Sequence, residues 1–242
     1  MMQSNNQQAY DRGVTVFSPD GRLYQVEYAR EAVERGSATV GVRTSESVVL
    51  ASLGRRRSPL VEPESIEKIH DMDGRLGIAS AGHVADARRL VDFGRQHAQR
   101  ERLRYDEAPG VETIAKAIAD FVQESTQTGG SRPFGAALLV GGVTDEGPRL
   151  YEVDPSGTPY EWRATAVGSG SDDIRAFLED GYDAGIGTTD GTSLALRALA
   201  EGTDEDLTPE EIGLATLDAE GYRKLDRERR ASALEDAGLG AS

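Results

Sequence analysis

The stretch from Glu34 to Thr44, ERGSATVGVRT, decides how the chain is organised. It begins where a helical pattern stops, passes through Gly36, and enters a β-rich run that Ser37 opens. A second β-rich run, VVLASL, follows after a short polar link, and the two together predict a hairpin. Some hydrolases place a nucleophile at such a strand start. The stretch therefore raises the question of whether Ser37 performs chemistry or serves only the fold.

Upstream of this stretch, the sequence predicts a turn followed by a helix. The turn SPDG, Ser18 to Gly21, has proline at its second position and then Asp-Gly. Apolar residues then recur at helical spacing up to Gly36, a typical C-cap residue, which predicts a helix over Leu23–Arg35. We expect three parts: a flexible tail over 1–16, the turn and helix over 17–36, and the main domain over 37–242.

Downstream, the pattern predicts strands, two helices, strands, helices and strands. A strand over Leu76–Gly82 precedes a helix over Val84–Arg104, and a second helix covers Val111–Thr128. The apolar face expected for the first of these helices consists of Val84, Ala87, Val91, Gly94, Ala98 and Leu103. The later runs AALLVGGV, RLYEVD, EIGLATLD and YRKLD read as strands, and YEWRATAVG contains one or two more. Because strands and helices do not alternate, the sequence predicts an α+β fold with two antiparallel sheets and helix layers outside.

Composition narrows the class of protein. The chain has 242 residues, no cysteine, and 42 acidic against 27 basic residues, which gives a net charge of −15. Without cysteine there are no disulfides, thiolate metal sites or cysteine nucleophiles. The acidic balance disfavours nucleic-acid binding and resembles that of proteins from salt-loving microbes. No apolar run is long enough to span a membrane and the N-terminus lacks a signal-peptide core, so we expect a cytoplasmic protein.

Few residues form a recognisable chemical site. None of the three histidines lies three or four residues from another, so the spacing predicts no metal site and no cofactor. The glycine-rich link VGSGSDD, from Val167 to Asp173, could hold a phosphate at a helix N-terminus. It matches neither phosphate-binding fingerprint, so a tight turn in which Ser171 or Asp172 caps the helix is the favoured interpretation.

The chain resembles the proteasome α subunits, and archaeal halophilic members most closely. The segment from Tyr10 to Gly36, YDRGVTVFSPDGRLYQVEYAREAVERG, is similar to their N-terminal signature, including the serine-proline turn and QVEYA. ESIEKI, SAGHVADAR, GGSRPFGAALLVGG, DPSG and ATAVGSG continue the similarity in order over about residues 10 to 225. The resemblance implies the four-layer αββα sandwich of N-terminal-nucleophile hydrolases.

The resemblance also bears on Ser37. In the related β subunits, cleavage frees a threonine at this strand start, and an acidic residue about sixteen positions later and a lysine complete the site. Here that later position is Leu53, whose side chain cannot hold a lysine ammonium. The helix before Ser37 is retained, so its nitrogen is an amide and cannot serve as base. We expect Ser37 to have a structural role and the chain to have no catalytic residue.

The implied function is architectural. Seven copies would form the outer ring of a 20S core, stack on rings of β subunits, restrict substrate entry, and dock a regulatory AAA ATPase ring. The resemblance assigns the gate to Tyr10, Asp11, Pro19 and Tyr28, and the ATPase tail site to Lys68 and Gly82. We expect Glu64 and Glu67 to orient the Lys68 ammonium. His83, where relatives commonly have leucine, and Gly13, in place of alanine, depart from the family pattern.

Two alternatives from other classes remain open. One is a self-processing β-type peptidase, which the retained N-terminal segment and Leu53 oppose. The other is a nucleotide-binding domain that uses the glycine-rich link. An intact N-terminus by mass spectrometry and a nucleotide titration would test them.

Overall fold

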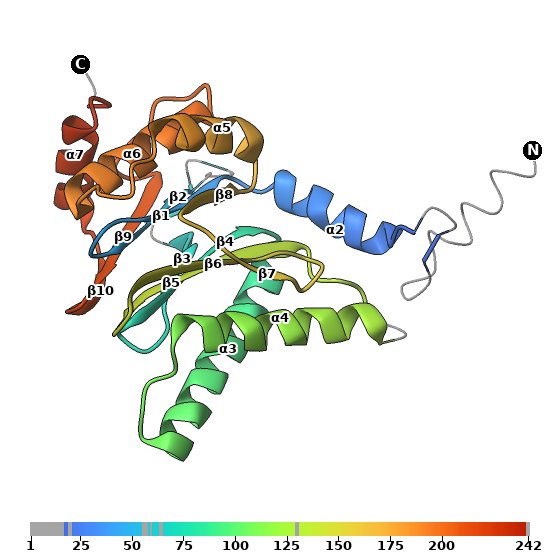
Figure 1. The fold of residues 1–242 in the computed structure, drawn as a ribbon. Helices are drawn as coiled ribbons and strands as arrows, with labels where there is room; N and C mark the ends of the chain where they lie inside the picture. Colours follow the sequence, from blue (N-terminus) through green and yellow to red (C-terminus); the bar gives the residue numbers. More distant parts are fainter. Residues whose placement is uncertain are drawn as a thin grey trace, which may run out of the picture.

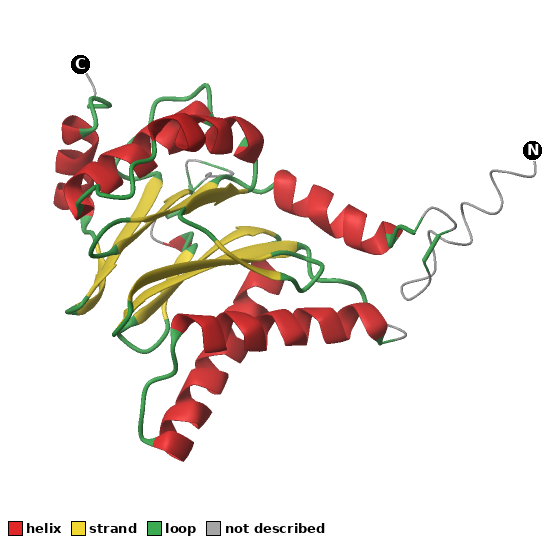
Figure 2. Cartoon of the chain, viewed as in Figure 1, coloured by secondary structure: helices red, strands yellow, loops and turns green. Residues whose placement is uncertain are grey.

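Two five-stranded antiparallel sheets lie face to face between two layers of helices (Figures 1 and 2). This computed structural model describes residues 17–18, 21–54, 58, 60–62, 65–128 and 131–240. In the first sheet the strand order is β10 (Gly221–Lys224), β9 (Ile212–Asp218), β2 (Val48–Leu53), β1 (Thr39–Arg43) and β8 (Ala164–Val167). In the second it is β3 (Ile69–Asp71), β4 (Leu76–Gly82), β5 (Ala136–Thr144), β6 (Gly147–Val153) and β7 (Pro159–Glu161). This four-layer arrangement confirms the predicted fold class.

The helices cover the outer faces of both sheets. Helices α5 (Ser171–Gly181), α6 (Thr188–Glu201) and α7 (Arg227–Asp236) lie over the first sheet, and α3 (Val84–Tyr105) and α4 (Val111–Gln127) lie over the second (Figure 1). Helix α2 (Tyr24–Glu34) lies beside the sandwich and packs against β4 and β5. None of the helices described is long and apolar enough to pass through a lipid bilayer.

Three apolar cores hold these layers together. One lies between α3, α4 and the second sheet, one between the two sheets, and one between the first sheet and α5 and α6. Since both sheets are inner layers, their central strands are buried on both faces. This explains why the runs at β2 and β5 are almost continuously apolar instead of alternating. The sequence signal for these strands was therefore strong.

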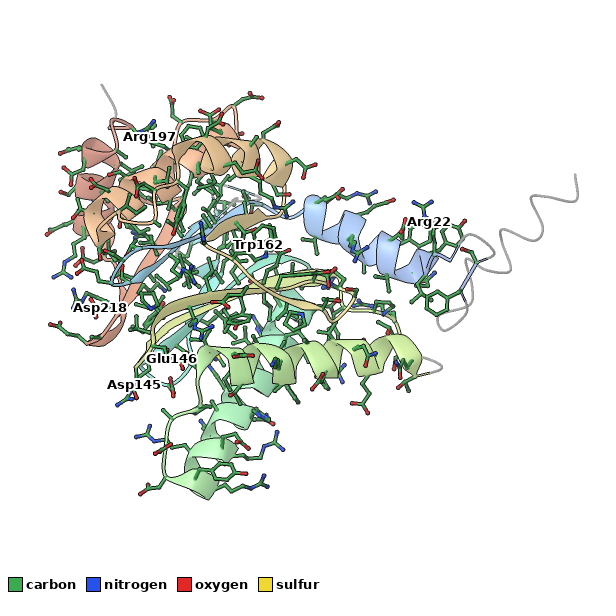
Figure 3. The ribbon with its side chains drawn as sticks, in the orientation of Figure 1. Arg22, Asp145, Glu146, Trp162, Arg197 and Asp218 are labelled. Atoms are coloured by element: carbon green, nitrogen blue, oxygen red, sulfur yellow. The ribbon has the colours of Figure 1, made fainter. Side chains whose placement is uncertain are left out.

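The hairpin expected from the opening stretch is confirmed. β1 and β2 pair antiparallel, with Arg43 opposite Val48, and the Thr44 amide donates to the Ser47 carbonyl at 2.8 Å. The later run YEWRATAVG contains two strands that belong to different sheets. β7 pairs with β6 and β8 pairs with β1, so the chain crosses between the sheets at Trp162, whose side chain lies at this crossing (Figure 3).

Three local predictions were wrong. Val84 is 61% exposed and Leu103 is 88% exposed, so neither belongs to the buried face of α3. Leu103 lies five residues beyond Ala98, about 140° further round the helix, on the opposite side from the core. Neither Ser171 nor Asp172 caps α5. Its N-cap is Gly170, in the left-handed conformation and without a side-chain cap.

Candidate functional site

The junction between α2 and β1 is where the candidate residues gather. The amide of Gly36 closes the end of α2 by donating to the Val33 carbonyl at 2.8 Å. Position 36 needs glycine because the backbone of Gly82 lies close to it, and a Cβ at Gly36 would overlap the Gly82 backbone nitrogen. The C-cap position itself is held by Arg35, with ordinary right-handed geometry. The junction is therefore seated directly on the turn that ends β4.

Lys68 reaches the same junction from the segment just before β3. Its Nζ donates to the carbonyl oxygens of Ser37 at 2.6 Å, Ala38 at 3.2 Å and Leu53 at 3.2 Å, and lies 3.1 Å from the Ser37 Oγ. The residue is partly exposed along its length, but the ammonium lies beneath the surface. Sequence reasoning missed this contact. The one available signal was that lysine is rare in a chain that otherwise prefers arginine.

Two expectations about Lys68 need correction. Leu53 does help to hold the ammonium, through its backbone carbonyl instead of a side chain. Glu67 does not orient it, because its carboxylate accepts from the Lys224 Nζ at 2.9 Å and lies 3.5 Å from the His70 Nδ1. Glu64 lies outside the described residues. Backbone carbonyls, which the sequence pattern does not reveal, therefore take the place that carboxylates were expected to fill.

Burial lowers the pKa of the Lys68 ammonium to about 7. The three carbonyl oxygens act in the opposite direction, since only a protonated amine has three N–H groups to donate to them. Burial thus brings the pKa of Lys68 close to neutral pH, so the charge of its side chain is sensitive to further changes at this site.

Ser37 lies two residues before β1, in the segment that follows α2 and Gly36. Its nitrogen is a peptide amide, because α2 and Gly36 precede it without interruption. No carboxylate among the described residues contacts its Oγ, and the nearby ammonium is already bonded to carbonyls. Through Lys68, Ser37 thus takes part in the contact that joins the segment just before β1 to the end of β2.

Gly82, on the other side of the junction, is held by a second group of contacts. Its φ of +101° favours glycine, and a Cβ would overlap the carbonyl oxygen of Gly135. The Asp86 carboxylate binds Arg132 through both oxygens, at 2.6 and 2.8 Å, and accepts from the Gly135 amide at 2.9 Å. Burial raises the pKa of Asp86, but these hydrogen bonds and the Arg132 charge outweigh it, so the pKa is lowered overall. His83 is largely exposed, with its Nδ1 3.9 Å from Asp86.

The glycine-rich link before α5 also contacts the α2–β1 junction, at Gly36 and Ser37. The Ser169 amide donates to the Gly36 carbonyl at 2.7 Å, and a Cβ on Gly168 would crowd the Ser37 carbonyl at 2.7 Å. The Ser171 amide donates to the Gly168 carbonyl. The amides of Ser169 and Ser171 are therefore used within the chain and are not available to a phosphate.

Of the four predicted gate residues, the structure describes one. Tyr28 lies on α2 and is 46% exposed. Tyr10, Asp11 and Pro19 lie outside the described residues. Of the predicted docking residues, Lys68 and Gly82 are brought together at the α2–β1 junction, one on each side of Gly36 and Ser37.

Comparison with known proteins gives consistent matches over nearly the whole chain. A family model for proteasome subunits matches residues 33–217, and one for the N-terminal signature of A-type proteasome subunits matches residues 10–32. The proteasome alpha-1 chain of Haloarcula marismortui is 58% identical over 241 residues, which cover 99% of this chain and 93% of the relative. The proteasome alpha chain of Natronomonas pharaonis is 57% identical over 242 residues, covering 99% and 95%. The proteasome alpha-1 chain of Haloferax volcanii is 57% identical over 220 residues, covering 91% and 87%.

Proposed function

This chain belongs to the proteasome subunit family, among its α subunits, and from that premise we propose that it is a non-catalytic, ring-forming subunit of a 20S core. Seven copies form the outer ring in the cytoplasm of a halophilic archaeon. The ring stacks on rings of β subunits, which perform the peptide-bond cleavage. It restricts entry to the chamber and docks a regulatory AAA ATPase ring.

The observation that carries this proposal is the continuous chain through the α2–β1 junction. An N-terminal nucleophile needs its own α-amino group as base, and residue 37 has an amide instead. The position expected for an acidic partner supplies only the Leu53 carbonyl, and that carbonyl is bonded to Lys68. These features support a structural role for the α2–β1 junction, which positions α2, and they do not support a role in hydrolysis.

The experiment that tests non-catalysis replaces Ser37 in an assembled core. Purified rings of this chain alone should cleave no fluorogenic peptide, and cores assembled with β subunits should cleave it. In those cores Ser37→Ala should leave turnover unchanged, whereas replacing the N-terminal threonine of the β subunit should remove it. Loss of turnover with Ser37→Ala in a core of normal mass would overturn the proposal.

Regulation is proposed to act at the same junction. Lys68 and Gly82 form the site for the C-terminal tail of the ATPase, whose carboxylate would pair with the ammonium. Tyr10, Asp11, Pro19 and Tyr28 hold the gate. The contacts of Lys68 with Ser37, and of Gly82 with Gly36, support a link between the two sites, because both lie against the end of the helix that follows the tail.

The gate is tested by deleting residues 2–12. Cores with the shortened chain should hydrolyse small peptides several-fold faster without any ATPase, because the barrier to entry is gone. Their sedimentation should match that of the full-length core, which controls for assembly. A shortened core that assembles normally but shows unchanged turnover would show that these residues are not the barrier.

A further inference from the structure

Two of the three lysines of this chain make their contacts at consecutive positions of one short segment. The Lys68 Nζ binds backbone carbonyls at the α2–β1 junction, and the Lys224 Nζ donates to the Glu67 carboxylate at 2.9 Å. The third, Lys116, lies elsewhere, on α4. In a chain with 27 basic residues of which only three are lysines, the meeting of two ammonium groups distinguishes this segment from the rest of the surface.

The segment that carries Lys68 has little regular structure of its own. No strand or α-helix lies between β2 and β3 in the described part of the chain. On one side, its backbone is attached to β4, because the Lys68 carbonyl accepts from the Ser80 amide at 3.0 Å. The Ser80 carbonyl in turn accepts from the Thr39 hydroxyl of β1 at 2.9 Å. Gly82 lies two residues beyond Ser80 on the same strand, so this attachment helps to set the distance between the two proposed docking residues.

Glu67 provides a second attachment, which reaches both sheets. Lys224 is the last residue of β10, the edge strand of the first sheet, and it donates to one oxygen of Glu67. The other oxygen lies 3.5 Å from the Nδ1 of His70, which pairs with Ile78 in the second sheet. Burial acts to raise the pKa of the Glu67 carboxyl, but the hydrogen bond from Lys224 and the nearby positive charges outweigh it, so the pKa is lowered overall. The residue before Lys68 is therefore an ionised anchor at neutral pH.

We propose that Glu67, held by Lys224, is a positioning residue for the binding of the ATPase tail at Lys68. This rests on the proposed function. Glu67 does not contact the Lys68 ammonium; it fixes the backbone one residue earlier, so the lysine side chain starts from a defined point. A tail carboxylate has to draw the ammonium away from its internal carbonyls. If the backbone were loose, the lysine would also lose conformational freedom on docking, and fixing it in advance removes that cost.

A role in the stability of the fold alone explains this ion pair less well. The side chains of Lys224 and Glu67 are 51% and 49% exposed, and exposed ion pairs contribute little to the free energy of unfolding. The pair also differs from its neighbour on β10. Arg223 pairs at 2.9 Å with Glu220, three residues away in the same hairpin, whereas Lys224 and Glu67 are 157 residues apart. The longer link connects the end of β10 to the segment proposed to dock the tail.

The experiment is a double-mutant cycle in assembled cores at one molar-range KCl concentration. Glu67→Gln, Lys224→Ala and the double variant are compared with the unmodified core, and sedimentation verifies assembly. Arg223→Ala is the matched control, because it removes an ion pair from the same strand without changing Glu67. Binding of a fluorescent peptide with the sequence of the ATPase tail is measured by anisotropy, and stimulated turnover is titrated with the ATPase ring.

Each single variant should bind the peptide about two- to five-fold more weakly, the range expected for the loss of one exposed ion pair. The apparent affinity for the ATPase ring should fall further, because several tails bind at once. Maximal stimulation at saturating ATPase should not change. The double variant should be no weaker than the single ones, since the two side chains act as one unit. Lys224→Arg, which keeps the charge, should retain most of the binding.

The outcomes separate this inference from the proposed function. If the unmodified core neither binds the peptide nor responds to the ATPase, the proposed docking function fails. If the unmodified core binds and Glu67→Gln binds equally well, or the two single effects add in the double variant, the inference fails while the function stands. A lower maximal stimulation at unchanged affinity, or an equal loss in Arg223→Ala, would point to a general effect on the core and would also overturn the inference.

Discussion

The contacts of Lys68 explain why a lysine stands at this position in a chain whose other basic residues are mostly arginine. Three carbonyl oxygens, from Ser37, Ala38 and Leu53, converge on its Nζ. An ammonium is a compact point with three donors, which suits such a convergent set, whereas a guanidinium is a larger planar fork. The same compact charge would suit a single incoming carboxylate. The contacts within the chain and the proposed docking contact therefore both use the Lys68 Nζ. A docked tail carboxylate must compete for it with the carbonyl oxygens of Ser37, Ala38 and Leu53.

This competition leads to a prediction about pH. Because burial lowers the pKa of Lys68 to about 7, the amine loses its charge as pH rises through that value. ATPase-stimulated protein degradation, divided by basal peptide turnover, should therefore fall between pH 6.5 and about 8.5 in the unmodified core. Lys68→Arg should show weaker stimulation that does not change with pH, since guanidinium remains charged. Lys68→Ala should lose stimulation about ten-fold or more, the effect of one charge-assisted hydrogen bond repeated round a ring.

The matched control for Lys68 is Lys116→Ala. Lys116 is exposed on α4 and pairs with Glu112 at 2.6 Å, so its loss should leave stimulation unchanged. Normal stimulation in a Lys68→Ala core would show that this lysine serves only to join β1 and β2. A profile for the unmodified core that is as flat as that of Lys68→Arg would show that the ammonium stays charged throughout.

At the scale of elements, the start of α3 is fixed to the loop before β5 by Asp86. Its carboxylate binds Arg132 and the Gly135 amide, and Gly135 in turn accepts from the His83 amide at 2.7 Å. Gly82 lies within this set, with backbone geometry and close contacts that admit no side chain. The turn on which α2 rests is therefore held by contacts that α3 and β5 supply.

Acid should release this turn. The pKa of Asp86 is lowered in the fold, so its contribution to stability is complete above the unfolded value near 3.9 and is lost as pH falls through the lower folded value. Asp86→Asn should reduce the free energy of unfolding at pH 7 by about 1–2 kcal/mol, a modest figure because Arg132 is largely exposed. The difference from the unmodified chain should shrink as pH falls from about 4 to 3.

Denaturant titrations at constant molar KCl would measure this effect, with Asp172→Asn as the control. Asp172 is fully accessible on α5 and pairs with Arg175 at 3.2 Å, so its change should cost much less. A difference between Asp86→Asn and the unmodified chain that stays constant from pH 7 to 3 would contradict the assignment, because a carboxylate contribution must vanish once it is protonated.

For the whole molecule, the distribution of charge is uneven. The net charge is −15, yet α3 is a basic element and the layer of α5 and α6 is strongly acidic. The proposed ring of seven chains would carry more than one hundred negative charges, so copies would repel one another wherever salt does not screen them. The fold of one chain withstands this repulsion because apolar cores stabilise it. Association between chains has to overcome the repulsion at each contact.

Assembly should accordingly depend on salt. When KCl falls from about 1 M to 0.1 M, the screening length grows from about 3 Å to 10 Å, and repulsion reaches across the contacts between chains. Sedimentation of purified rings should show progressive dissociation over this range, while circular dichroism shows that the chain stays folded. Replacing KCl by an equal osmolality of sucrose would control for water activity. Rings that persist at 0.1 M KCl would contradict this prediction.

The sequence by itself determined the layers of this protein. Apolar runs such as VVLASL, helical periodicity before Gly36 and the turn signals between them are local features, and the runs of motifs identified the family. Only the tertiary structure decided which backbone groups meet. It placed the Leu53 carbonyl on Lys68, divided β7 and β8 between two sheets, assigned the short strand β3, and turned Leu103 away from the core. The physical reason is that side-chain patterns are encoded residue by residue, whereas carbonyls are alike at every position and acquire a partner only when distant segments come together.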